Sequence, residues 1–208
     1  AVSSEMLKKA LTEIVNITYN CLSVDGDHST NDTCAVMANG LAKNAEITAE
    51  GDNYEVFKKA LYIVMMNITK MLAKDGEGAT KLLECTVTGA KDLDTAIIVA
   101  TSVICSPLFR CAMFGADANW GRILCAVGYA DADFDINKVD VSLSSKAGEI
   151  HVCHNGAGIE FSEEVAKTVL LEDEITISVS IGDGNGTATA WGCDLTYDYV
   201  KINGDYRS

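Results

Sequence analysis

Residues 52–88 read DNYEVFKKALYIVMMNITKMLAKDGEGATKLLECTVT, and this stretch decides the fold class. Asp52 and Glu55 stand at the spacing of a helix-capping box, and apolar residues then recur at helical spacing. After a turn that contains two glycines, apolar and polar residues alternate with the period of a half-buried strand. A long helix that leads into a strand predicts an α/β protein. The expected helical face carries Phe57, Leu61, Val64, Ile68 and Leu72, and the apolar strand positions are Leu83, Cys85 and Val87.

The turn in this stretch, DGEGATK at residues 75–81, places Glu77 between two glycines. A carboxylate at a helix-to-strand junction can face a cleft here, because glycine neighbours do not crowd it. The alternative is an ordinary solvated loop acid, and the residues by themselves favour that alternative. The spacing from glycine to Lys81 does not match a phosphate-binding P-loop.

A second concentration of polar residues precedes the long helix, where residues 24–33 read VDGDHSTNDT. Short polar side chains hydrogen-bond to nearby backbone, so this loop predicts an elaborate turn with a helix cap at Asn31 or Asp32. The sharper alternative is a polar wall of an active site, held between helices. An amphipathic helix is expected before the loop, over residues 4–21, and a short buried helix after it, over residues 34–41.

Two further helices are expected after the strand. The first begins at Asp92 or Asp94 and is ended by Pro107, and the second is capped by Asn119. The stretch FGADANWGR, residues 114–122, ends in Arg122, for which two interpretations are equally supported.

In the first of these interpretations, Arg122 pairs with Asp117 as a structural buttress while Trp120 fills the core. In the second, Arg122 meets an anionic ligand beside the free N–H groups of a helix start.

Strand patterns dominate beyond residue 131, with a short helix capped by Ser162 between them and Asp194 as the expected cap of a final helical piece. This half predicts a small antiparallel or mixed sheet with one covering helix. We therefore divide the chain into a helix-rich α/β part, residues 1–130, and a smaller strand-rich part, residues 131–208.

Composition narrows the partners and the compartment. The formal net charge of −14 would repel a phosphate backbone, which argues against nucleic acid as a partner. No apolar run approaches the roughly 20 residues that span a bilayer, and no signal-peptide pattern opens the sequence. The eight cysteines sit among apolar neighbours without a C-x-x-C pair, which favours buried reduced thiols. Together these features predict a cytoplasmic protein without a membrane partner.

Residue chemistry alone gives only weak site candidates. His28 in the polar loop is the best-placed general base, although a loop histidine is more often merely exposed. A zinc site at His151, Cys153 and His154 is not expected, because a strand would direct His154 away from the other two side chains. No thiol stands out as a nucleophile. The residues alone therefore predict a small-molecule cleft of unknown specificity and no metal.

Four stretches of the sequence resemble a known protein family, and this resemblance gives a more specific prediction of fold and function. VDGDHSTNDT at residues 24–33, DGEGATK at 75–81, FGADANWGR at 114–122 and the ending DLTYDYVKINGDYRS closely resemble the β chain of the ornithine acetyltransferases, also called glutamate N-acetyltransferases. The motifs occur in matching order over essentially the whole chain. The resemblance implies a layered α-β-β-α sandwich of the type shared with self-cleaving aminopeptidases, completed by an α chain and followed by a smaller C-terminal mixed-sheet domain.

The same resemblance implies a reaction and a site. Proteins of this family cut their precursor before a threonine, which then attacks N-acetylornithine, keeps the acetyl group as an ester and passes it to glutamate. A covalent step suits this weak hydroxyl nucleophile, since it divides one acyl transfer into two easier steps. By motif, the implied substrate-binding residues of this chain are Glu77, Asn203 and Ser208.

Other components of the reaction are expected outside this sequence. The nucleophilic threonine is expected upstream of Ala1, and oxyanion stabilisation is expected from the α chain, in an α2β2 heterotetramer. No resident cofactor is implied, and acetyl-CoA would be a co-substrate if the enzyme is bifunctional. The sequence departs from the family at Ala118, where proline is common, and at Arg110, where lysine is usual. A related aminopeptidase or amidase and a non-catalytic binding subunit remain the alternative functions.

Overall fold

The computed structural model describes residues 1–206, and its contacts divide the chain into two compact units. Unit 1 comprises Ala1–Asn20 and Asp27–Thr69, and unit 2 comprises Cys21–Gly26 and the chain from Lys70 onward. The division falls inside helix α2 (Asp52–Lys74). It differs from the predicted boundary near residue 130, because one sheet of unit 2 joins strands from both sides of that position.

Unit 1 is built on helix α1 (Ser4–Asn16) and the first part of α2. The Ser3 hydroxyl caps α1 by accepting a hydrogen bond from the backbone N–H of Met6. Met6 and Ala10 pack with the fully buried Tyr54 of α2 in a small apolar core. Lys58 adds an ion pair with Glu13 at 3.2 Å.

Two expectations for unit 1 are wrong: a helix at residues 34–41, and the extent of the covered face of α2. Residues 34–41 form no helix, and Met37 and Leu41 are 92% and 75% exposed. A helix that is apolar nearly all round is stable only when it is covered on every side. Helix α2 is confirmed, but it buries Tyr54 and Met65, whereas Val64 on the predicted face is 55% exposed. The apolar face of α2 is therefore wider than the part of it that other residues of this chain cover.

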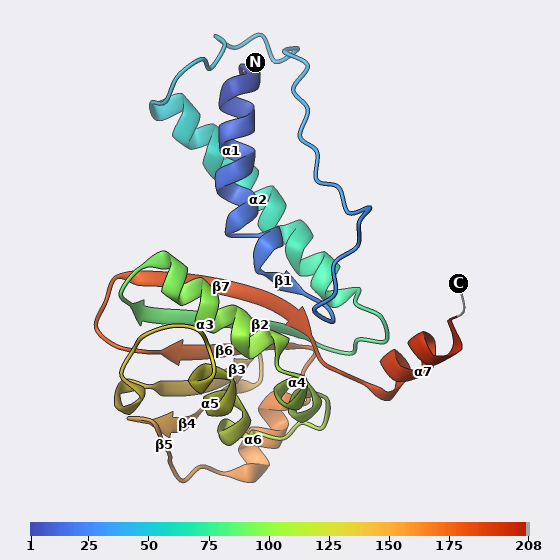
Figure 1. Cartoon of the computed structure of the whole chain (residues 1–208), viewed down its shortest axis with the longest axis vertical. Coiled ribbons are helices and arrows are strands. Elements are labelled where there is room, and N and C mark those ends of the chain that lie inside the picture. Colours follow the sequence, from blue (N-terminus) through green and yellow to red (C-terminus); the bar gives the residue numbers. More distant parts are fainter. Residues whose placement is uncertain (207–208) are drawn as a thin grey trace. The chain divides into compact units, whose positions relative to one another are not determined.

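Unit 2 contains, within the described residues, a seven-stranded mixed sheet with the strand order β1-β7-β2-β6-β3-β4-β5 (Figure 1). The predicted α/β class is confirmed, and the strand from residue 82 belongs to the same sheet as the C-terminal strands. Strand β2 runs parallel to β6 and antiparallel to β7. The strands are β1 (Leu22–Ser23), β2 (Leu82–Ala90), β3 (Asp140–Ser145), β4 (Gly148–His154), β5 (Ala157–Gly158), β6 (Glu174–Ser180) and β7 (Gly186–Cys193).

Helices of unit 2 begin at the residues that the sequence marks as caps. Asp92, Asn119 and Ser162 each accept a hydrogen bond from a backbone N–H of the first turn, and the first of these helices ends just before Pro107. The helices are α3 (Leu93–Cys105), α4 (Pro107–Phe114), α5 (Trp120–Gly128), α6 (Glu163–Leu170) and α7 (Tyr197–Asp205), and short 3-10 turns occupy Tyr19–Cys21 and Ile136–Lys138.

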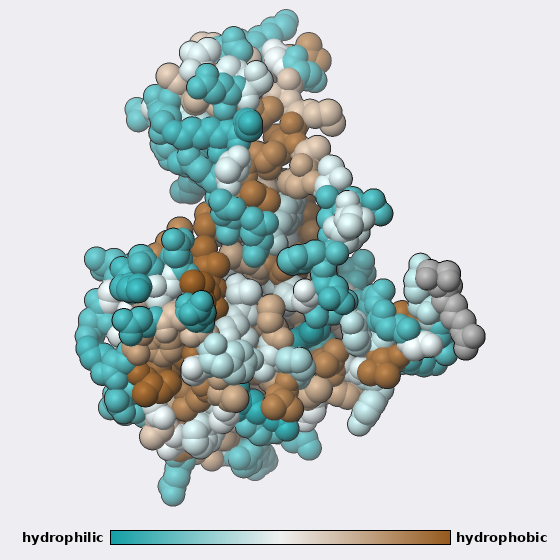
Figure 2. Space-filling view, in the orientation of Figure 1, coloured by the Kyte–Doolittle hydropathy of each residue, from teal (hydrophilic) through white to brown (hydrophobic). Residues whose placement is uncertain are grey.

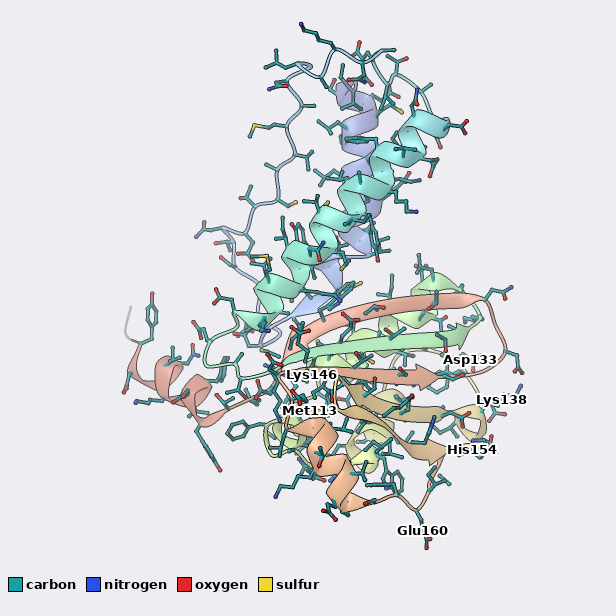
Figure 3. The ribbon with its side chains drawn as sticks, turned by 180° about the vertical axis from the view of Figure 1, so that it is seen from behind. Met113, Asp133, Lys138, Lys146, His154 and Glu160 are labelled. Atoms are coloured by element: carbon teal, nitrogen blue, oxygen red, sulfur yellow. The ribbon has the colours of Figure 1, made fainter. Side chains whose placement is uncertain are left out.

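The core of unit 2 lies between the sheet and helix α3, which contacts β2 and β7. Figures 1 and 3, which show opposite sides, agree that α3 and α5 lie on one side of the sheet. The inward positions Leu83, Cys85 and Val87 are fully buried, as predicted. Positions of the other parity form polar rows across the strands, for example Thr189, Thr86 and Ser178. The two faces of the sheet therefore differ sharply in polarity.

The cysteines only partly follow the prediction. Cys21, Cys85, Cys153 and Cys193 are buried, but Cys34, Cys105, Cys111 and Cys125 are exposed. Three of these lie on α3, α4 and α5, whose apolar residues reach the outer surface.

In the described part of the chain no single helix is long and apolar enough to cross a membrane; only α3 and α4 together, bent by 58°, reach the required length and composition.

Candidate functional site

Glu77 lies in the turn that joins α2 to β2, and its side chain is exposed. The turn depends on Gly78, whose φ of +67° is a left-handed conformation that favours glycine. A Cβ atom at Gly78 would lie 2.7 Å from the backbone nitrogen of Tyr199 on α7. The turn and the start of α7 therefore approach each other too closely to admit a side chain at this position.

Asn203, on α7, reaches Glu77 directly. Its side-chain Nδ2 donates a hydrogen bond of 2.6 Å to the Glu77 carboxylate and a second one of 3.1 Å to the backbone oxygen of Tyr199. The structure thus brings together two of the three residues that the resemblance marks as substrate ligands. The third, Ser208, lies outside the described residues.

The start of the polar loop also reaches α7. Asp25, which belongs to unit 2, accepts a hydrogen bond of 3.2 Å from the hydroxyl of Tyr199. From Asp27 the loop belongs to unit 1, where Asn31 donates its backbone N–H to the Ser29 hydroxyl in a local turn. No helix follows that turn up to residue 51, so the expected cap at Asn31 or Asp32 is wrong.

Asp194 contacts the Glu77 turn instead of capping a helix. Thr196 is the N-cap of α7, and Asp194 is 2% exposed at the end of β7. Its Oδ1 accepts hydrogen bonds from the backbone N–H groups of Thr80 and Lys81, at 2.8 and 2.9 Å, and its Oδ2 accepts one from the Thr80 hydroxyl. Sequence reasoning missed this role, because the two segments lie far apart in the chain.

Two buried cations support the same region. The Lys81 ammonium donates to the backbone oxygens of Met113 and Leu170, at 2.5 and 2.7 Å, near the carboxyl ends of α4 and α6. A helix carboxyl end carries partial negative charge and favours a cation. Burial lowers the pKa of the Lys81 ammonium below its ordinary value, and the Asp194 carboxylate opposes that shift.

Arg110 is 3% exposed. Its Nε donates to the backbone oxygen of Cys193 at 2.7 Å, and its Nη2 donates to that of Asp194 at 3.3 Å. Burial raises the pKa of the Cys193 thiol, and the Arg110 guanidinium opposes this shift. Arg110 therefore fixes the backbone from which α7 departs.

The other sequence candidates lie elsewhere. Arg122 donates to the backbone oxygen of Leu108 at 2.8 Å, while Asp117 accepts from Asn119, so the Arg122–Asp117 pair, one of the two interpretations of this arginine, does not form. His28 is exposed in unit 1. His154 bonds through Nδ1 to Asp140 at 2.8 Å, near the sheet edge where Figure 3 labels it. Within residues 1–206, no group of three or more His, Cys, Asp or Glu side chains could hold a metal ion.

The Glu77–Asn203 pair presents a carboxylate and a primary amide at the surface of this chain. A carboxylate accepts hydrogen bonds from an ammonium group, and a primary amide can accept and donate. Both side chains are exposed, while the elements that carry them are tied by buried groups. The pair offers hydrogen-bonding groups, and neither residue is a nucleophile.

Comparisons with known proteins show the family of the chain. The family model described as the ArgJ family matches residues 1–208. The chain is 53% identical to the arginine biosynthesis bifunctional protein ArgJ 1 of Clostridium acetobutylicum and 44% identical to the ArgJ protein of Bacillus subtilis, in each case over its whole length. It spans only about half the length of the curated relatives that it matches, 51% and 50% for these two.

A solved structure extends the likeness to three dimensions. It is the crystal structure of the arginine biosynthesis bifunctional protein ArgJ from Bacillus halodurans, which is 45% identical and superposes with a TM-score of 0.93. The match covers 99% of this chain and 95% of that chain. A chain of nearly the same extent therefore exists in that crystal structure, although the curated relatives are about twice as long.

Proposed function

Because the chain belongs to the ArgJ family, we propose that it is the β chain of a glutamate N-acetyltransferase of arginine biosynthesis. This enzyme would move an acetyl group from N-acetylornithine to glutamate through an acetyl-threonine intermediate. In this scheme the present chain supplies part of the amino-acid binding site. The acetyl-accepting threonine belongs to the part of the protein that this chain does not span.

The contact between Asn203 and Glu77 carries the proposal. These residues come from two motifs far apart in the sequence, and a hydrogen bond of 2.6 Å joins them. The proposed role of Glu77 is to accept hydrogen bonds from an ammonium group of ornithine or glutamate. The proposed role of Asn203, together with Ser208, is to bind the carboxylate end of the same amino acid.

The binding of both substrates at one site suits the reaction. In the first half-reaction the threonine hydroxyl forms an ester with the acetyl group, and ornithine leaves with its restored amine. In the second, the amine of glutamate takes the acetyl group and the hydroxyl is released. Because N-acetylornithine and glutamate both carry a carboxylate on the α-carbon, one set of ligands can bind that end of the substrate in both half-reactions.

A second chain is part of the proposal. The curated relatives are about twice as long as this chain, and the matched chain in the Bacillus halodurans structure has nearly its extent. Both observations support an α chain made from the same precursor, and we propose assembly into an α2β2 heterotetramer in the cytoplasm. Apolar side chains of unit 1 that stand exposed, among them Met37 and Val56, are the proposed contacts of that partner. Figure 2 shows such hydrophobic residues at the surface among hydrophilic ones.

The test uses the full-length protein that contains this chain, expressed so that both chains form. Release of ornithine from N-acetylornithine is measured with and without glutamate, and N-acetylglutamate is quantified by mass spectrometry. Glutamate-dependent release with an equal yield of N-acetylglutamate is the expected result. Equal release into water without glutamate would support the aminopeptidase or amidase function instead.

Two further arms complete the assay. Absence of turnover in the assembled protein, with N-acetylornithine still bound, would support a non-catalytic binding subunit. Replacement of N-acetylornithine by acetyl-CoA tests acetyl-CoA as a second acetyl donor, which is the proposed meaning of the word bifunctional in the names of the relatives. No resident cofactor is proposed.

A further inference from the structure

Asp194 joins the two segments that carry the proposed substrate ligands. We propose that Asp194 is a positioning residue, which sets the separation of Glu77 and Asn203 by holding the Glu77 turn against the start of α7. The inference rests on the proposed function, because it concerns the site of that reaction. Asp194 itself is buried and does not reach the exposed side chains that bind substrate.

The hydrogen bonds of Asp194 restrain the turn strongly. One carboxylate binds two consecutive backbone N–H groups and one hydroxyl, all from Thr80 and Lys81, so the backbone after Glu77 has little freedom. In addition, the backbone N–H of Asp194 donates to the oxygen of Lys81 at 3.3 Å. Hydrogen bonds to a charged acceptor are about twice as strong as neutral ones.

A second connection lies just beyond Asp194. The Thr196 hydroxyl, which caps α7, also donates to the backbone oxygen of Gly78 at 2.7 Å. The β7–α7 connection therefore holds the turn both at Gly78, next to Glu77, and at Thr80. Since α7 carries Asn203, any shift of the turn relative to α7 changes the Glu77–Asn203 distance.

Buried contacts of Arg110 and Lys81 with neighbouring elements hold Asp194 and the turn in place. Arg110 binds the backbone oxygens of Cys193 and Asp194, and Lys81 is fixed to the ends of α4 and α6, at Met113 (Figure 3) and Leu170. These contacts are buried, whereas the substrate ligands are exposed. Buried contacts thus fix the segments that carry an accessible pair of proposed ligands, which is the arrangement that a preorganised site needs.

The experiment is a double-mutant cycle in the assembled full-length protein. Asp194→Ala should raise the KM for N-acetylornithine on the order of tenfold or more, with a smaller change in kcat, because a small displacement of binding groups is costly. Asp194→Asn keeps an oxygen that can accept hydrogen bonds from both backbone N–H groups, so the KM of this variant should stay close to the wild-type value. In a Glu77→Gln background, Asp194→Ala should change KM less than about twofold, because residues that act through each other are not additive.

Controls separate this role from general stability. Asp183→Ala removes an exposed carboxylate of the same unit, which pairs with Lys138, and it should leave KM unchanged. If Asp194→Ala does not fold, Asp194→Asn and Thr80→Val carry the test, since Thr80→Val removes one of the three bonds and should raise KM in the same direction. A KM increase from Asp194→Ala that is equally large in the wild-type and in the Glu77→Gln backgrounds, or no rescue by Asp194→Asn, would overturn the inference.

Hydrogen–deuterium exchange distinguishes this inference from the proposed function. If the unmodified protein transfers no acetyl group, the proposed function fails, but the connection can still be measured. Faster exchange in Asp194→Ala that is confined to residues 76–82 and 197–206 supports the positioning role. Exchange that is unchanged there, or raised across the whole sheet, contradicts it.

Discussion

Gly78→Ala should damage both the stability and the substrate affinity of the assembled protein, and its effect can be worked out from the structure. At a φ of +67°, any residue with a Cβ costs about 1–2 kcal/mol. The new Cβ would also lie 2.7 Å from the nitrogen of Tyr199 and 2.9 Å from the carbonyl carbon of Asp198, both backbone atoms that cannot rotate away. Overpacking of this kind costs about 1–3 kcal/mol. The sum of about 2–5 kcal/mol corresponds to a decrease in Tm of about 4–20 °C for a chain of this size.

Alanine substitutions at two other glycines separate the cost of the backbone conformation from the cost of the close contact. Gly148 in unit 2 also has a positive φ, +141°, and a Cβ there would make only an ordinary contact of 3.8 Å with Val169, so Gly148→Ala should show only the cost of the unusual backbone conformation. Gly128, inside α5, has open space, and its replacement by alanine should be neutral or stabilising.

The assay combines differential scanning fluorimetry with the KM for N-acetylornithine. Because the start of α7 must move to accept the new methyl group, Gly78→Ala should raise KM on the order of tenfold or more. Gly148→Ala and Gly128→Ala should leave it unchanged. Equal Tm and KM for Gly78→Ala and Gly148→Ala would refute the close approach of the turn and α7.

Three further outcomes follow from the contacts. Glu77→Gln keeps an oxygen that can accept from Asn203 but removes the charge, so KM for N-acetylornithine should rise while Tm stays within the range of an exposed control, Glu160→Gln. Lys81→Met leaves two helix-end carbonyl oxygens without their donor and should lower the free energy of unfolding by about 1–3 kcal/mol, measured by urea titration. Burial raises the pKa of Cys21 to about 11; because the unfolded thiol ionises first, its contribution to stability should fall as pH rises from the ordinary thiol range toward 11. Chemical denaturation at about pH 8 and about pH 10.5 should therefore show a smaller loss for Cys21→Ala than for the unmodified protein.

Local structure in this chain follows closely from local sequence. Asp92, Asn119 and Ser162 cap their helices as predicted, because a cap depends on a side chain and the next few backbone N–H groups. Strand β2 follows its alternating pattern for the same reason. The Arg122–Asp117 pair failed because the actual partner lies farther away in the sequence: the guanidinium binds the Leu108 backbone, and no local rule selects that oxygen over the carboxylate of Asp117.

The failed helix at residues 34–41 has a different cause. Its sequence is apolar nearly all round, which is the pattern of a segment covered on all sides. In this chain Met37 and Leu41 are exposed instead. The pattern therefore reports an environment that these 208 residues do not provide by themselves, and it agrees with the proposal that a second chain completes the protein.

The pairing of β2 with β7 explains why the candidate site could not be assembled from sequence. Leu82 and Cys193 lie opposite each other at the end of this antiparallel pair. The turn that precedes β2 and the helix that follows β7 must therefore leave the sheet at the same end, which brings Glu77 to Asn203 and Asp194 to Thr80. A shift of the pairing by one residue would turn the apolar face of each strand outward, so burial of Leu83, Cys85 and Val87 fixes the register. The same burial that stabilises the sheet thus determines the geometry of the proposed substrate ligands, although no short stretch of sequence contains both.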